Sequence, residues 1–302
     1  MLDPDLVLDA AARERLVDRF GPGTQQWCDT LPELVAKCCS YWDLELDEAL
    51  SGGTSRVFLG RQHQSRAVVL KLTPDLSVAD TEAAALRAWA ANPHCADLLD
   101  AHAETGALLL EKLEPGIKLS DQAGLPSLAD LAELLISLRA ADPKGLHRLP
   151  ALAQRVDFLF TLIGRRLGHP RVSALVTSGM AARGHRLAQK LAVGGDTGLV
   201  HGDLHPANVL TAGSDRGLVV IDPRPCFGDR TFDAVDWALG RAATVNEVTS
   251  RIQQLCAHMP GLDGDRLRYW CQATAVIVAV QRLYRRPPDD ATKLLLQLAV
   301  AS

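Results

Sequence analysis

The chain has 302 residues, of which 47% are hydrophobic and 23% are charged, and its formal net charge is −4. This length allows one large domain or two lobes, and the composition is typical of a globular protein. The negative net charge argues against a nucleic-acid partner held by general electrostatics, and the longest apolar run, at residues 273–280, is too short to cross a bilayer.

The N-terminus and the cysteines give two further expectations. Residues 1–5 lack the basic segment and the apolar run of a signal peptide, so we expect a cytoplasmic protein with no membrane partner, and we favour a monomer. The seven cysteines include no CxxC pair and mostly lie in helical or apolar patterns. We therefore expect buried thiols rather than a disulfide framework or a zinc site.

The first part of the chain changes from helical to strand-like periodicity. Amphipathic helices are predicted at 3–20 and 24–42, and a further helix at 78–91 ends at Asn92-Pro93. Strands are predicted at 44–50, 56–60, 67–72, 95–100 and 106–113. Residues 114–116, Glu-Pro-Gly, interrupt this pattern and mark the expected boundary between two lobes.

The rest of the chain is mainly helical. Helices are predicted at 127–141, 151–167, 172–193, 232–242, 246–259, 263–284 and 289–300, with a short hairpin at 208–222. This order predicts an α+β fold in which residues 1–113 form a small lobe with an antiparallel sheet and two leading helices. Residues 114–302 then form a larger helical lobe, and a cleft between such lobes is a common ligand site.

Residues 201–208, His-Gly-Asp-Leu-His-Pro-Ala-Asn, carry the strongest functional signal. The Gly and the Pro keep this segment from becoming a helix, so Asp203 can face a cleft and accept a proton from an attacking hydroxyl. Asn208, and Asp222 at the end of the apolar run 218–221, offer oxygens that suit magnesium. The three residues at these spacings predict phosphoryl transfer from a nucleotide.

Other interpretations of this loop are open. A lone Asp in a loop is usually a turn or cap residue, and the alternation His201-x-Asp203-x-His205 can hold a transition metal. The metal interpretation leaves Asn208 and Asp222 without a role, whereas phosphoryl transfer uses both. In the favoured interpretation the two histidines order the loop or face the substrate.

Lys71 lies inside the apolar run 68–72, where an unpaired ammonium would be costly. Nucleotide phosphates and a carboxylate of the next helix would satisfy it. Glu82 is the natural candidate for this carboxylate and Asp80 is the alternative, unless Lys71 points outward from an edge strand.

Two main-chain segments are candidates for nucleotide contacts. The turn formed by Ser51, Gly52, Gly53, Thr54 and Ser55 can lie over phosphates through its amides, although most Gly-Gly pairs are simple turns. There is no GxxxxGK[ST] motif, so a P-loop is not supported. Backbone groups near Glu111 and Leu113, at the end of the last strand of the first lobe, are expected to bind the adenine edge.

The motif at 201–208 with Ile221-Asp222-Pro223 resembles the aminoglycoside phosphotransferase family, a branch of the protein-kinase-like fold. Further segments resemble its streptomycin 6-phosphotransferase and hydroxyurea phosphotransferase branch, namely 31–42, 86–89, 108–116, 221–225, 228–229 and 232–233. The resemblance implies a bilobal kinase that uses ATP and Mg²⁺ to phosphorylate a small-molecule hydroxyl, on an aminoglycoside-type antibiotic or hydroxyurea. A sugar or amino-alcohol acceptor is the alternative, and a nucleotide-binding protein without catalysis is a third.

The resemblance also implies roles for particular residues. Asp203 is the expected base, Asn208 and Asp222 are the expected magnesium ligands, and Lys71 is expected to contact the α and β phosphates with Glu82 as its partner. Protein kinases usually carry Asp-Phe-Gly at the position of residues 222–224, which read Asp-Pro-Arg here. This difference argues for a small-molecule acceptor.

The acceptor site is much less defined by the sequence. Asp233 is interpreted as the N-cap of a helix at 234–242. Residues 201–302 contain eleven Asp plus Glu and eleven Lys plus Arg, so the charge balance does not indicate a cationic acceptor. The candidate acceptor-binding residues are His205, Asp229, Asp236, Trp237 and Trp270.

Overall fold

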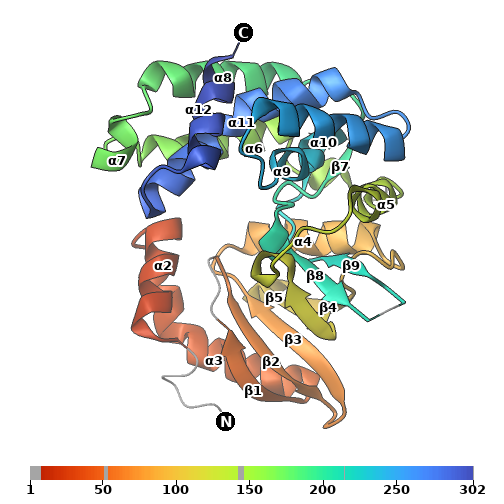
Figure 1. The fold of residues 1–302 in the computed structure, drawn as a ribbon. Coiled ribbons are helices and arrows are strands. Elements are labelled where there is room, and N and C mark those ends of the chain that lie inside the picture. The colour runs from red at the N-terminus through yellow and green to blue at the C-terminus, as the bar shows by residue number, and fades with distance from the viewer. Residues whose placement is uncertain (1–7, 51–53, 142–145, 214, 302) are drawn as a thin grey trace.

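The computed structural model describes residues 8–50, 54–141, 146–213 and 215–301, which form a sheet-containing lobe and a helical lobe (Figure 1). The sheet-containing lobe has five antiparallel strands in the order β1-β2-β3-β5-β4. Its elements are α2 (Ala10–Phe20), α3 (Thr24–Trp42), β1 (Leu44–Leu50), β2 (Arg56–Gln62), β3 (Arg66–Leu72), α4 (Leu76–Ala88), β4 (Leu98–His102) and β5 (Ala107–Glu111). The predicted residues Ser51, Gly52 and Gly53 lie outside the described residues.

Alternation along the strands sets the two faces of this sheet. Leu109 of β5 packs in a core with Phe58, Leu70 and residues of α3. Its neighbour Leu108 lies on the opposite face, where it packs against Ala79 and Ala83 of α4. Successive strand residues point to opposite faces, so α3 and α4 cover different sides of the sheet.

Most of the other helices of the helical lobe pack around α11, and most residues of α11 are buried. It also carries a three-stranded sheet in the order β6-β8-β9 and a two-stranded sheet of β7 and β10. Its elements are β6 (Pro115–Lys118), α5 (Leu128–Leu138), α6 (Leu152–Gly164), α7 (Pro170–Ser173), α8 (Ser178–Ala192), β7 (Thr197–Val200), β8 (Val209–Ala212), β9 (Leu218–Val220), β10 (Cys226–Asp229), α9 (Val235–Leu239), α10 (Val245–His258), α11 (Gly264–Arg285) and α12 (Asp290–Val300).

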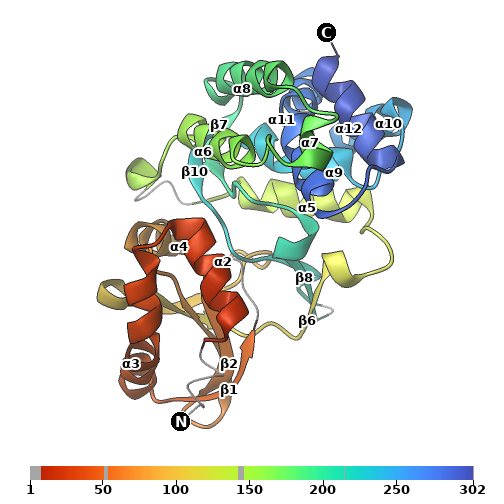
Figure 2. The ribbon, with the colours of Figure 1, turned by 90° about the vertical axis from the view of Figure 1, so that its left-hand side faces the viewer.

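Two segments join the lobes next to the site. The end of α4 enters the large core of the helical lobe, where the Trp89 indole N–H donates to the carbonyl of Leu138 at 2.9 Å. At the other side of the molecule, α2 rises from the sheet-containing lobe toward the helical lobe (Figure 2). There the Arg19 guanidinium lies 4.5 Å from the ring centre of Phe158 on α6.

The α+β fold with a small antiparallel lobe and a larger helical lobe is confirmed, and several element predictions need correction. The helix predicted at 172–193 is broken into α7 and α8, because Thr177 leaves the helix and its hydroxyl caps α8 by accepting the N–H of Met180. The break predicted at residues 114–116 runs into a strand instead, because residues 115–118 pair with β8 as β6. The predicted helix at 232–242 is a 3₁₀ segment, Arg230–Ala234, followed by the short α9.

All seven cysteines have free thiols, and five of them are buried, as predicted. Within the part of the chain that the structure describes, no helix has the length and apolar character needed to cross a membrane.

Candidate active site

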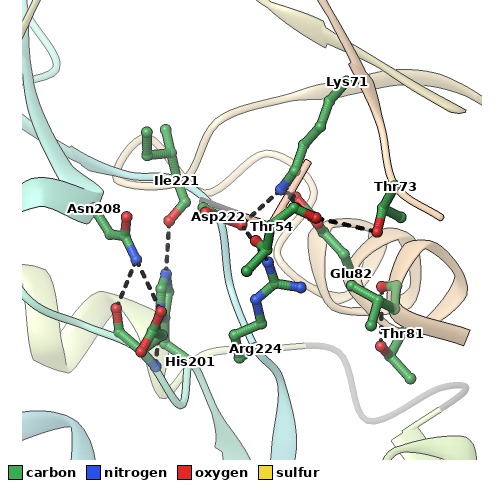
Figure 3. Close-up of polar contacts among 12 residues, drawn as sticks. Thr54, Lys71, Thr73, Thr81, Glu82, His201, Asn208, Ile221, Asp222 and Arg224 are labelled. Atoms are coloured by element: carbon green, nitrogen blue, oxygen red, sulfur yellow. Dashed lines mark hydrogen bonds and ion pairs between the residues drawn. The ribbon is translucent and has the colours of Figure 1, made fainter. Parts of the chain in front are cut away.

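Lys71 of β3 contacts two carboxylates, and its contact with Asp222 joins the sheet-containing lobe to the helical lobe (Figure 3). Its Nζ lies 2.5 and 2.6 Å from the two carboxylate oxygens of Glu82 on α4, and 2.7 Å from Oδ1 of Asp222. The expected Lys71–Glu82 contact therefore forms. Asp222 follows β9 with a φ of 55°, a left-handed conformation that a non-glycine residue rarely adopts. Such conformations often occur where the surrounding structure holds a functional residue in place.

The electrostatics of this cluster favour the charged forms of Lys71 and Asp222, whereas burial raises the pKa of Glu82 although the Lys71 cation opposes this shift. Burial lowers the pKa of Lys71, but Asp222 and Glu82 oppose burial, so the net shift of this pKa is upward. Burial raises the pKa of Asp222, while the Lys71 and Arg224 cations lower it to about 2. Lys71 is thus an ammonium at neutral pH, which suits contact with phosphates. Asp222 is a carboxylate, which suits contact with a metal cation.

The buried carboxylate of Asp233 binds the main chain of the loop at 201–208. Its carboxylate oxygens accept the main-chain N–H of His201 at 2.7 Å and of Gly202 at 2.9 Å. Asp233 is therefore not the helix N-cap that the sequence suggested. The cap of the 3₁₀ segment is Asp229, which accepts the N–H of Thr231. Burial raises the pKa of Asp233 to about 7, although the two amide bonds act in the opposite direction.

His201 is fully buried and orders the loop through both ring nitrogens. Nε2–H donates to the carbonyl of Ile221 at 3.1 Å, Nδ1 accepts the N–H of Asp203 at 3.4 Å, and the ring stacks on Trp89. Both nitrogens are used, so His201 is not available to a transition metal. The described residues also contain no cluster of three or more His, Cys, Asp or Glu that could hold a metal ion.

The buried imidazole of His201 predicts a specific pH dependence of stability. Burial lowers its pKa from 6.5 to about 4, so the unfolded chain takes up a proton below pH 6.5 that the folded protein does not. Stability from this group is complete above pH 6.5 and falls as the pH drops toward 4. Between pH 8 and pH 5, the unfolding free energy of the wild type should fall by about 2 kcal/mol more than that of His201→Gln. Urea titrations at the two pH values measure both losses. Equal losses in both proteins would contradict this assignment.

Asp203 and Asn208 contact each other on this loop. Nδ2 of Asn208 donates to the carbonyl of Asp203 at 2.9 Å and lies 3.4 Å from its Oδ2. These contacts use the amide nitrogen of Asn208 and leave its amide oxygen for another ligand. Arg155 of α6 donates to Oδ1 of Asp203 and to the carbonyl of Gly202, both at 3.0 Å. The side chain of Asp203 is one third exposed and can meet a ligand.

The remaining nucleotide candidates lie at the edge of this cluster. Thr54 contacts the site, because its hydroxyl accepts from Arg224 and its carbonyl accepts from Thr73 at 3.4 Å. The neighbouring Ser55 is buried. At the other edge, the main-chain N–H of Glu111 donates to Asp97, and its carboxylate binds Arg216 at 2.7 Å. These bonds occupy the amide and the carboxylate of Glu111, and the expected adenine contacts of backbone groups near Glu111 and Leu113 stay a prediction.

Three acceptor candidates are wrong for a reason of packing. Trp237 and Trp270 are fully buried in the helical core, and Asp229 is equally inaccessible. Asp229 binds the Trp270 indole N–H at 2.6 Å and Arg266 at 2.5 Å, so it neutralises a buried polar cluster instead of facing a ligand. His205 and Asp236 do line a cavity next to Asp203.

This acceptor-side cavity has a volume of about 860 Å³ and lies between α2, α6, α9, α11 and α12. Asp203 and His205 form part of its floor, and Arg19 and Arg155 approach it from α2 and α6. Sequence reasoning missed Arg155, because nothing in its local pattern differs from an ordinary exposed helix residue. Arg224 had a local signal, since it follows Asp222 by two positions.

The two lobes, the Lys–Glu pair and the loop with Asp203 and Asn208 define a phosphotransferase of the protein-kinase-like fold. The family model described as aminoglycoside/hydroxyurea antibiotic resistance kinase matches residues 42–285. The chain belongs to this family of small-molecule kinases.

Individual relatives agree with this assignment. The chain is 34% identical over 258 residues to hydroxyurea phosphotransferase of Kitasatospora aureofaciens, covering 83% of this chain and 72% of that protein. It is 30% identical over 218 residues to streptomycin 6-kinase of Streptomyces griseus, covering 70% and 68%. A solved structure with the same fold is choline kinase LicA from Streptococcus pneumoniae, with a TM-score of 0.60, 15% identity, and coverage of 89% and 97%.

Proposed function

We propose that this chain transfers the γ-phosphoryl group of ATP, with Mg²⁺, to a hydroxyl of a small molecule. The observation that carries the proposal is the contact of Lys71 with Glu82 and Asp222, next to the loop that presents Asp203. In this arrangement Lys71 contacts the α and β phosphates and Asp203 accepts the proton of the attacking hydroxyl. Arg155 and Asn208 fix the Asp203 carboxylate for this step.

The residues present fit a magnesium ion. The ion prefers hard oxygen ligands and keeps several waters, and Asp222 and the amide oxygen of Asn208 are ligands of this kind. They would hold Mg²⁺, which neutralises charge on the phosphates when bound. A cytoplasmic location is part of the same proposal, because ATP is its donor and all seven thiols are free.

The first acceptors to test come from the relatives, which act on hydroxyurea and streptomycin by name. Purified protein with ATP and MgCl₂ should release ADP in the presence of an acceptor, and EDTA should abolish this release. ³¹P NMR should then show a phosphate ester on the acceptor. Acceptor-independent ADP release, or release that survives EDTA, would contradict the proposal.

A further inference from the structure

The charge of the acceptor-side cavity differs from what a polycationic acceptor needs. Its wall carries seven arginines and three aspartates, Asp203, Asp233 and Asp236. Two of the aspartates are already engaged, since Asp203 binds Arg155 and Asp233 accepts two backbone amides. Of these three aspartates, only Asp236 has a carboxylate that makes no hydrogen bond or ion pair with the described residues, and burial raises its pKa to about 6. One partly titrating carboxylate is a weak site for a polycation.

The arginines, in contrast, exceed their carboxylate partners. Arg155 and Arg224 approach Asp203 and Asp222, and Arg282 binds Asp289 at 2.6 Å. The other four have no carboxylate partner among the residues that the structure describes. These four are Arg19, Arg166, Arg241 and Arg285.

Two of these unpaired cations are held in place by aromatic rings. The Arg19 guanidinium lies 4.5 Å from the ring centre of Phe158, and that of Arg166 lies 4.8 Å from that of Tyr284. Contact with an aromatic face stabilises a guanidinium without neutralising it. Burial, together with the cations of Arg155 and Arg224, lowers the pKa of Arg19 to about 10, so these like charges stand close enough to repel each other.

Like charges gathered around a cavity are stabilised when an anion binds between them. The planar fork of a guanidinium also matches a carboxylate or a phosphate in two parallel hydrogen bonds. The arginines nearest Asp203 and Asp222 already have carboxylate partners, whereas Arg166, which follows the end of α6, and Arg285, the last residue of α11, have none among the residues that the structure describes. An anionic group therefore finds cationic partners at the C-terminal ends of α6 and α11, which leaves Asp203 to meet a hydroxyl.

We propose that the acceptor is a hydroxylated anion, with a carboxylate or phosphate group bound by Arg166 and Arg285 and its hydroxyl directed to Asp203. This inference rests on the proposed function, because it assigns the substrate class of the same site. It distinguishes this chain from the relatives whose names refer to streptomycin or hydroxyurea.

Calorimetric titration of the full chain, saturated with Mg²⁺ and a non-hydrolysable ATP analogue, tests the charge preference without turnover. The probes share one pyranose skeleton: glucose is neutral, glucosamine cationic, glucuronate a carboxylate and glucose 6-phosphate a phosphate. At least one of the two anions should bind about tenfold or more tightly than glucose and glucosamine, and the tighter of the two identifies the preferred anion. No anion binding, equal binding of all four, or tighter glucosamine binding would overturn the inference.

Variants test whether arginines of the cavity wall cause the preference for an anion. Arg166→Ser with Arg285→Ser should remove the tenfold advantage of the anion, whereas Arg186→Ser, an exposed arginine of α8 outside the cavity, should keep it. Unchanged anion binding in the double variant would contradict the proposed contacts. ADP release measured in parallel separates the two proposals. No release with any acceptor contradicts the proposed function, whereas release that is greatest with streptomycin supports that function and overturns the anionic class.

Discussion

Asp203→Asn is expected to lower turnover by about 10²–10⁴-fold, the usual effect of removing a positioned acid–base group. The amide keeps the shape of the side chain and can still accept a hydrogen bond from Arg155, but it cannot take the proton of the attacking hydroxyl. ATP should bind with nearly the same affinity, because Lys71, Glu82 and Asp222 are untouched. Steady-state ADP release with the best acceptor, fitted for kcat and for the KM of ATP, measures both quantities.

A matched carboxylate controls for the loss of charge alone. Asp265 is strongly exposed at the start of α11 and binds Arg268 at 3.2 Å. Asp265→Asn should leave kcat unchanged. If Asp203→Asn keeps the wild-type kcat, Asp203 is not the base. If it instead raises only the KM of ATP, the residue acts in nucleotide binding.

The sequence predicted those features whose cause is local. The apolar run around Lys71 contains a charge that needs a partner, and Glu82, eleven residues later, is this partner because α4 packs against the face of the sheet that contains Leu108. The alternation in β5 likewise fixes its two faces. The helix break at Thr177 was missed, because a single capping threonine inside an otherwise helical pattern gives a weak signal.

The acceptor side could not be predicted in the same way. Asp229 was a candidate because it follows Asp222 closely in the sequence, and Trp270 was a candidate wall residue of the helical lobe, but they bind one another inside the core. Large aromatic side chains are highly buried on average, so their presence near a motif says little about a ligand. The arginines of the cavity come from α2, α6, α9–α10 and α11, and only the fold brings them together.

Lys71→Met is expected to lower the free energy of unfolding by about 3–5 kcal/mol, the cost of leaving one charge of a buried pair without its partner. Lys71 is 5% and Glu82 1% exposed, so water cannot replace the lost ammonium. Asp222 is less affected, since Arg224 lies 3.5 Å away and its own side chain is one third exposed. Urea unfolding measures the loss. Lys37→Met, in an exposed pair with Glu104, should cost about 0–1 kcal/mol under the same conditions.

The double variant Lys71→Met with Glu82→Leu separates stability from catalysis. Replacing both members of a buried ion pair by apolar groups is often neutral or stabilising, so this protein should recover most of the lost unfolding free energy. Its turnover should stay as low as that of Lys71→Met, because no ammonium remains to contact the phosphates. If turnover returned with stability, Lys71 would serve only to hold α4 against the sheet, and the nucleotide would have to be held by other residues.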